Sequence, residues 1–168
     1  MHIVVAPDSF KESLSALEAG ETIKKAILAE FPSAVVDVCP MADGGEGILE
    51  TLVYATNGTF VDVNVRGPLG APIDTRYGVL GDRETVVIEI AKIAGLMLVS
   101  PDERDPMKTT TYGIGETFAH ALERGFRKFI IGLGGSATND GGFGMLQALG
   151  IAFYDQYGNE VAPIGSSL

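Results

Sequence analysis

Apolar residues at the start of the chain follow a strand pattern, then a helical one, then a strand pattern again. Residues 2–6 form a short, continuous apolar run rich in β-branched side chains, and residues 34–38 form a second such run. Both runs predict buried strands. Between them, apolar side chains recur at helical intervals, and Ser15 and Glu18 have the spacing of a capping box. This spacing predicts a helix over residues 15–30.

A second helix is expected after the next glycine-rich motif. The sequence Asp-Gly-Gly-Glu at 43–46 precedes a stretch in which apolar residues again return on one helical face, and Asn57-Gly58 ends that stretch. Asn and Gly readily adopt the left-handed conformation that ends many helices. The positions expected to face inward are Ile48, Leu49, Leu52 and Val53. The first part of the chain therefore predicts the order β-α-β-α, with the two strands parallel.

The pattern changes in the middle of the chain. In residues 59–66, valines alternate with polar residues, which is the period of a strand with one wet face. Two further strand-like segments, 73–80 and 85–90, are bounded by turns rich in Gly, Pro and Asp, and this arrangement predicts a β-meander. We therefore expect two units, residues 1–58 and residues 59–168.

The last part of the chain predicts a helix, a strand and a second glycine-rich loop. Thr111 begins a stretch of helical spacing that Gly125 ends, and residues 128–133 form an apolar run that predicts another buried strand. This run leads into the sequence Gly-Gly-Ser-Ala-Thr-Asn-Asp-Gly-Gly at 134–142, followed by a short helix over 143–149. The complete pattern is that of an α/β protein.

Composition narrows the classes of function. The 168 residues are 46% hydrophobic and 20% charged, which excludes a disordered chain. A net charge of −10 disfavours nucleic acids and anionic membrane surfaces as partners. The most apolar stretch, residues 86–99, is interrupted by Glu89 and Lys92 and is shorter than the roughly 20 residues that cross a bilayer. With a single cysteine and no signal-peptide pattern, we expect a cytoplasmic protein.

Polar residues follow each of the first two predicted strands. Asp8, Ser9 and Lys11 come just after the first strand, and Asp43 and Glu46 come after the second. Because parallel strands end at the same edge of a sheet, where open α/β sheets bind ligands, we expect these side chains to converge. Two simpler interpretations stay open. The two carboxylates of the second loop could cap their helix, and the charges of the first loop could form a solvated ion pair.

The second glycine-rich loop is a candidate phosphate-binding segment. Residues 132–137 fit the dinucleotide pattern G-x-G-x-x-A, with Asp155 at about the expected interval, and no Walker P-loop occurs. Asp140 opposes a dinucleotide, because a carboxylate ~4 Å from a phosphate costs about 4 kcal/mol at an effective dielectric constant of about 20. A bridging Mg²⁺ reverses that sign. We therefore interpret the loop as one that binds a magnesium nucleotide or a phosphorylated product through Ser136, Thr138, Asn139 and Asp140, although Asn139 or Asp140 could simply cap the next helix.

Five motifs, taken together and in this order, resemble the type-I glycerate kinase family of bacteria: residues 7–16, 40–47, 67–72, 108–113 and 134–142. The resemblance runs from residue 1 to the end of the chain, with Glu12 standing where the family pattern usually has Gly. It implies phosphorylation of D-glycerate that depends on ATP and Mg²⁺. It also implies a cleft between a Rossmann-like domain with a parallel sheet, here partial (1–58), and a second α/β domain (59–168).

Members of this family are longer than 168 residues, so the resemblance covers an N-terminal portion of the family fold. A sheet of only two strands is too small to be stable alone. We therefore expect the family's C-terminal portion, which is missing from this sequence, to complete the first sheet.

Phosphoryl transfer requires a cation, a metal-binding carboxylate and a residue that orients the acceptor hydroxyl. We assign Lys11 to the substrate carboxylate or the transferring phosphate, Asp8 or Asp43 to the hydroxyl or the metal, and Asp140 to the metal. The remaining binding residues are expected to be Ser9, Gly44, Gly45, Glu46, Gly134, Gly135, Ser136, Thr138 and Asn139. Two other classes of function stay open: a nicotinamide-dependent dehydrogenase that uses Gly132, Gly134, Ala137 and Asp155, and a ligand-binding module without catalysis.

Overall fold

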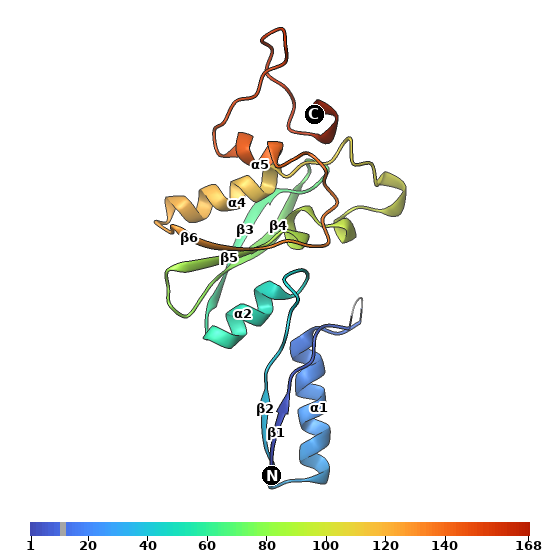
Figure 1. Cartoon of the computed structure of the whole chain (residues 1–168), viewed down its shortest axis with the longest axis vertical. Coiled ribbons are helices and arrows are strands. Elements are labelled where there is room, and N and C mark those ends of the chain that lie inside the picture. The colour runs from blue at the N-terminus through green and yellow to red at the C-terminus, as the bar shows by residue number, and fades with distance from the viewer. Residues whose placement is uncertain (11–12) are drawn as a thin grey trace.

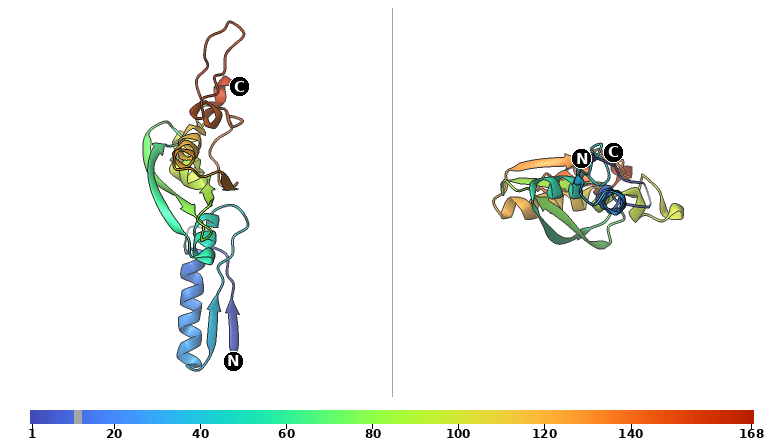
Figure 2. Two further views of the ribbon diagram at one scale, coloured as in Figure 1. Left: turned by 90° about the vertical axis from the view of Figure 1, so that its left-hand side faces the viewer. Right: turned by 90° about the horizontal axis from the view of Figure 1, so that it is seen from below.

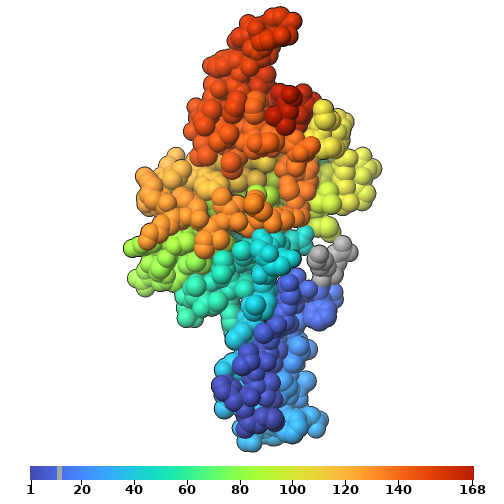
Figure 3. Space-filling view, viewed as in Figure 1, coloured from blue at the N-terminus to red at the C-terminus, as the bar shows by residue number. Residues whose placement is uncertain are grey.

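The structure is a computed structural model that describes residues 1–10 and 13–168. The molecule is elongated, with the N-terminus at one end of its long axis and the C-terminus near the other (Figure 1). The space-filling view shows a narrow N-terminal end and a broader upper part (Figure 3). The cyan and teal segment that includes residues 48–56 lies between these two parts.

The N-terminal end consists of two parallel strands and one helix. Strand β1 (His2–Val5) pairs with β2 (Val35–Val38), and helix α1 (Ala16–Glu30) lies alongside them (Figure 2). The predicted capping box is present: Ser15 Oγ accepts the Glu18 N–H at 3.2 Å, and the Glu18 carboxylate accepts the Ser15 N–H at 2.9 Å. The β-α-β order and the parallel pairing are therefore confirmed.

The prediction that these two strands are buried is wrong for one of their faces. Val5 and Val36 are buried on the face that α1 covers, whereas Val4 is 62% exposed and Val35 is 58% exposed on the opposite face. The apolar runs predicted cover on both faces. Within this chain, α1 packs against only one of them.

The second sheet contains four strands in the order β3-β4-β5-β6. Strands β3 (Thr59–Arg66), β4 (Pro72–Val79) and β5 (Thr85–Glu89) pair antiparallel in sequence, which confirms the meander. Strand β6 (Lys128–Gly132) joins β5 in parallel. The predicted burial of β6 is wrong, since Ile131 is 42% exposed on this edge strand.

Helix α2 (Ile48–Thr56) packs on β4 and β5 and covers one face of this sheet. Its Leu49 and Val53 form a buried cluster with Leu80 and Val87 of the sheet region. Gly78 of β4 permits this approach, because a Cβ there would collide with Val53. The division of the chain near Gly58 stays a prediction, and α2, which precedes it, packs on β4 and β5.

The other face of the sheet is covered by α3 (Ala91–Ala94) and α4 (Tyr112–Glu123). Val86 and Ile88, which flank Val87 in β5, contribute to the larger core cluster on this side. Helix α5 (Phe143–Ala148) packs on α4. The alternation along β5 therefore builds a layer of helices on each side of the sheet.

Short 3-10 helices complete the chain at Leu96–Leu98, Pro101–Glu103 and Gly165–Ser167. Among the residues described, no helix combines the length and the apolar character needed to span a bilayer.

Candidate active-site cleft

Three loops meet at a cavity of about 300 Å³. The first loop follows β1, the second follows β2, and the third follows β6. Their lining residues are Asp8, Ser9, Asp43, Gly45, Glu46, Leu133, Gly134 and Gly135. The parallel pairing of β1 and β2 sends both of their loops to one edge, and the glycine loop after β6 closes the third side. Seven predicted site residues therefore line one cavity.

A second cavity, of about 660 Å³, adjoins the first and shares Ser9, Glu46 and Gly135 with it. We call the two together the cleft. The second cavity is also lined by the loop before α1, the first turns of α1 and α2, the end of β5 and the segment from α3 to Met97. These lining residues are Phe10, Ser13, Leu14, Ser15, Glu18, Gly47, Glu50, Glu89, Ala91, Lys92, Gly95, Leu96 and Met97.

The two glycine-rich loops approach each other with their backbones. A Cβ on Gly134 would lie 2.8 Å from the Cα of Gly45, and a Cβ on Gly135 would lie 2.7 Å from Glu46 Oε1. Gly135 also has a φ of 60°, which L side chains rarely adopt. These positions therefore require glycine, and the same small residues leave backbone N–H groups accessible to a ligand.

Asp8 and Asp43 present carboxylates to the smaller cavity. Asp8 Oδ1 accepts the Ser9 N–H at 2.6 Å, and Asp43 Oδ1 accepts the Gly45 N–H at 3.0 Å. The second oxygen of each carboxylate accepts no hydrogen bond from the other described residues. One or two carboxylates, completed by water and phosphate oxygens, are what Mg²⁺ usually takes from a protein at a nucleotide site. Two carboxylates therefore meet this requirement for Mg²⁺. A larger cluster of three or more His, Cys, Asp or Glu side chains that could hold a metal does not occur among the described residues.

The cations of the cleft are few. Lys11, the predicted catalytic cation, lies outside the described residues. Among those the structure describes, Lys92 is the one cation that lines either cavity, and its Nζ lies 2.8 Å from Glu50 Oε1. The other oxygen of Glu50 is buried and has no hydrogen-bond partner. Carboxylates therefore dominate the charge of the described cleft lining.

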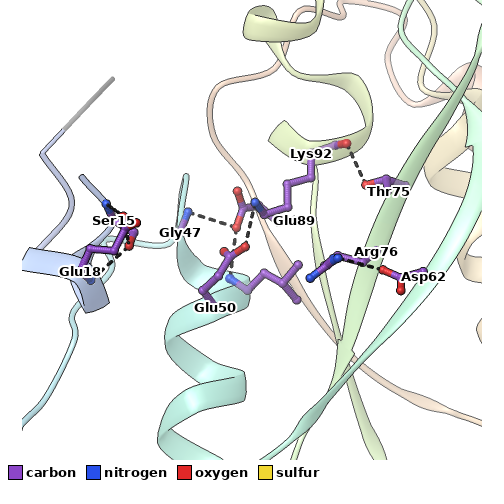
Figure 4. Close-up of polar contacts among 10 residues, drawn as sticks. Ser15, Glu18, Gly47, Glu50, Asp62, Thr75, Arg76, Glu89 and Lys92 are labelled. Atoms are coloured by element: carbon purple, nitrogen blue, oxygen red, sulfur yellow. Dashed lines mark hydrogen bonds and ion pairs between the residues drawn. The ribbon is translucent and has the colours of Figure 1, made fainter. Parts of the chain in front are cut away.

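Glu89 is a cleft residue whose role sequence reasoning missed. It ends β5, is 3% exposed, and its Oε2 accepts the N–H groups of Gly47 and Leu49 at 3.1 Å each (Figure 4). Burial raises the pKa of this carboxyl above its ordinary value, because the charged form loses its hydration. The signal was present in the sequence as a carboxylate inside an apolar run, which served there only to argue against a membrane span.

The interpretation of Asp43 and Glu46 as the caps of α2 is wrong. The cap residue is Gly47, with a φ of 88° and no side-chain capping bond, and the carboxylate that binds the first turn is Glu89. Asp43 accepts a hydrogen bond within its own loop instead. Both predicted residues are thus left at the cavity.

The placement of Asp140 argues against the metal role that we assign to it. Its side chain is 1% exposed and lines neither cavity of the cleft. Oδ2 accepts the N–H and the hydroxyl of Thr111, both at 2.8 Å, and the N–H of Gly144 at 3.1 Å, while Oδ1 accepts the N–H of Gly142 at 3.1 Å. Asp140 therefore ties the glycine loop to the starts of α4 and α5, which is close to the alternative that it caps the next helix.

Four predicted binding residues, Gly44, Ser136, Thr138 and Asn139, are not part of the cleft lining. The hydroxyls of Ser136 and Thr138 are 2.8 Å apart, and Asn139 is exposed. Gly44 has a φ of 97° in the loop before α2. None of these residues lines either cavity, so their roles as ligand contacts stay predictions.

Comparison with known proteins gives the cleft its context. The sequence profile of the glycerate kinase family matches residues 3–168. The chain belongs to the glycerate kinase family. Its sequence is 52% identical over 168 residues to the glycerate kinase of Bacillus subtilis (strain 168) and 49% identical over 168 residues to the glycerate 2-kinase of Escherichia coli (strain K12). Each alignment covers 100% of this chain and 44% of the relative.

The fold of this chain is also similar to that of a solved structure. A crystal structure of a protein described as a glycerate kinase 2 from Salmonella typhimurium LT2 superposes with a TM-score of 0.84 at 51% identity, covering 98% of this chain and 44% of that one. The chain thus spans less than half the length of these relatives. This agrees with the expectation that the family fold is longer than 168 residues.

Asp155 is poorly placed to bind the ribose of a dinucleotide, which is the role that the dehydrogenase alternative gives it. Its carboxylate accepts the N–H groups of Tyr157 and Asn159 in a local turn, and it lines neither cavity. Moreover, α5 begins only at Phe143, well after the loop at 132–137, whereas the dinucleotide pattern opens directly into its helix. These two placements argue against the dehydrogenase alternative.

Proposed function

We propose that the protein to which this chain belongs phosphorylates D-glycerate with ATP and Mg²⁺, and that the cleft is where the reactants bind. The observation that carries the proposal is the shared cavity, to which the loops after β1, β2 and β6 contribute seven of the predicted residues. The names of the similar proteins support the choice of reaction.

The glycine loops would bind the phosphates. Gly45 and Gly134 lie in backbone contact at the cavity, and their neighbours Gly44 and Gly135 have positive φ values. Successive backbone N–H groups in such turns form concave sites for anions. Lys11 is proposed, on the sequence alone, to meet the substrate carboxylate or the transferring phosphate.

Asp8 and Asp43 would hold Mg²⁺ or orient the acceptor hydroxyl. When bound, Mg²⁺ neutralises charge on the phosphates during transfer. Each carboxylate is oriented by one backbone N–H, that of Ser9 or Gly45, which leaves its other oxygen for the ligand. The carboxylate-rich lining and the net charge of −10 repel an uncomplexed triphosphate, so the chain favours the nucleotide only in complex with the metal.

An assay of ADP formation by the full-length protein tests the proposal. ADP should form only when ATP, Mg²⁺ and D-glycerate are all present, and Asp43→Ala should reduce kcat by roughly 10²–10⁴-fold, the range for a lost acid–base or positioning group. Asp82→Ala, a carboxylate in a turn that lines neither cavity, is the matched control and should leave kcat unchanged. Absence of ADP formation, or NADH binding that ignores Mg²⁺, would reject the kinase in favour of a binding module or a dehydrogenase.

The setting of the enzyme follows from the same chemistry. We propose a cytoplasmic location, where ATP is supplied and a single cysteine stays reduced. Small molecules are the proposed ligands, because the acidic chain repels nucleic acids and anionic lipid surfaces.

A further inference from the structure

Glu89 differs from the other carboxylates of the cleft because it is buried and because its backbone partners lie 42 and 40 residues away in the sequence. It is the last residue of β5, directly after the buried residues Val87 and Ile88, and is 3% exposed. A charged group in such a place is costly unless it is paired or hydrogen-bonded. The hydrogen bonds of the Glu89 carboxylate therefore have to offset the cost of its burial.

The partners of Glu89 are the first N–H groups of α2. Helix α2 follows the cap residue Gly47, which has no side chain to cap it, so the first N–H groups have no partner within the helix itself. Glu89 Oε2 accepts two of them, from Gly47 and Leu49, at 3.1 Å each. These bonds span 42 and 40 residues of sequence, and the positive end of the helix favours the negative charge.

The same residue lies where the second glycine loop begins. Glu89 pairs with Gly132 in the β5–β6 ladder, and the N–H of Ile90 donates to the Gly132 carbonyl at 3.1 Å. Gly132 contacts the other loop closely, because a Cβ there would collide with Ile48 and lie 3.2 Å from the Gly44 carbonyl oxygen. The end of β5 thus holds one loop by its backbone and the other by its side chain.

We propose that Glu89 is a positioning residue: by holding the first turn of α2, it fixes the loop at 43–47 at the distance from Gly134 and Gly135 that the reaction requires. This inference rests on the proposed function of the cleft. Glu89 acts through α2, and it is assigned no part in binding or proton transfer. A displacement of about 1 Å in a group that positions substrate can cost roughly 10²-fold in rate, so the anchor has measurable consequences.

The test compares three variants of Glu89 in the full-length protein. Glu89→Gln keeps an oxygen that accepts hydrogen bonds, Glu89→Asp keeps the charge but shortens the reach, and Glu89→Ala removes both. The matched control is Glu116→Ala: Glu116 Oε2 accepts the Arg66 N–H at 2.7 Å, and Glu116 lines neither cavity. Two quantities are measured: the rate of hydrogen exchange at the Gly47 and Leu49 amides, and kcat/KM for ADP formation.

We expect Glu89→Ala and Glu89→Asp to speed exchange at Gly47 and Leu49 at least ~10-fold and to lower kcat/KM by roughly 10²-fold. Glu89→Gln should stay within about threefold of the wild type in both quantities, because its amide oxygen accepts the same N–H groups. Glu116→Ala should leave kcat/KM and both amides unchanged. Such rescue by Gln alone separates positioning from a general loss of stability.

Three results would overturn the proposal. One is unchanged exchange at Gly47 and Leu49 in Glu89→Asp, which would show that the anchor does not hold this turn. Another is a Glu89→Gln variant with wild-type exchange at Gly47 and Leu49 but with kcat/KM as low as that of Glu89→Ala, which would assign the charge itself to the reaction. The third is faster exchange with an unchanged kcat/KM. If the wild type forms no ADP, the proposed function fails separately, while the exchange data still decide whether Glu89 anchors α2.

Discussion

Replacement of Asp140 by Asn separates an anchor from a metal ligand. The carboxylate of Asp140 is buried and accepts hydrogen bonds from Thr111, Gly142 and Gly144, which connects the glycine loop with the starts of α4 and α5. Asn has nearly the same shape and one oxygen that accepts. The substitution therefore changes the hydrogen bonding and the charge with little change in volume.

The magnitude follows from the four bonds. If the amide oxygen takes the place of Oδ2, the bonds from Thr111 and Gly144 persist without the carboxylate charge, and the amide group faces the Gly142 N–H, which loses its acceptor. A hydrogen bond to a charged group contributes about 1.5–3 kcal/mol, and a neutral one roughly half of that. Because such contributions are not additive, we expect the free energy of unfolding to fall by about 2–4 kcal/mol. A domain with ~5–15 kcal/mol of stability still folds after this loss.

Urea-induced unfolding followed by circular dichroism measures the change. The control is Asn139→Ala at the exposed neighbouring position, which should alter the free energy of unfolding by less than ~0.5 kcal/mol. A loss below ~1 kcal/mol for Asp140→Asn, together with a higher Mg²⁺ concentration for half-maximal activity, would refute the anchor and restore the metal role.

Three further predictions concern the loops and the titrating carboxyls. Gly134→Ala should lower kcat/KM at least ~10-fold, because the added Cβ would lie 2.8 Å from the Cα of Gly45. The control, Gly158→Ala, changes a glycine outside the cleft lining and should leave kcat/KM unchanged. Hydrogen bonds from the Thr85 hydroxyl and from the Glu84 and Thr85 N–H groups lower the pKa of Asp82 from 3.8 to about 2, so its stabilisation is complete above the unfolded value and lost as the pH falls toward 2. The urea midpoint of Asp82→Ala should therefore fall less steeply than that of the wild type across this window; equal slopes would contradict the assignment. Burial raises the pKa of Glu89, so the charged form of its carboxyl opposes folding at higher pH. Glu89→Gln should therefore have a larger free energy of unfolding than the wild type at pH 8, and this difference should shrink as the pH falls toward the ordinary pKa of 4.5. A difference that grows on acidification would contradict a raised pKa.

The positions of the helices and strands could be predicted because residues at their ends mark where each one begins or stops. The capping box at Ser15, the left-handed Asn57 and the glycine after α4 all mark helix ends where the sequence places them. The alternation of valines in β3 likewise predicted a strand of the meander. These signals act within a few residues, so they can be recognised without knowledge of the tertiary structure.

Burial and long-range anchors could not be predicted in the same way. An apolar run shows that a strand suits apolar neighbours, yet only the fold shows which faces are covered, as the exposed Val4 and Ile131 demonstrate. The cap of α2 comes from Glu89, 40 and 42 residues away from the N–H groups it binds, and a local capping pattern cannot find such a partner. The metal role that we assign to Asp140 stays a prediction, and its burial argues against it; a buried anchor and a metal ligand require the same residue type, so the sequence alone does not separate them.

The proposed function is tested most sharply by a crystal structure of the full-length protein with a non-hydrolysable ATP analogue, Mg²⁺ and D-glycerate. Phosphate oxygens should lie within hydrogen-bonding distance of the N–H groups of the loops at 43–47 and 134–135, and Mg²⁺ should be bound to Asp8 or Asp43. Reactants bound elsewhere, with these loops free of ligand, would contradict the proposed function.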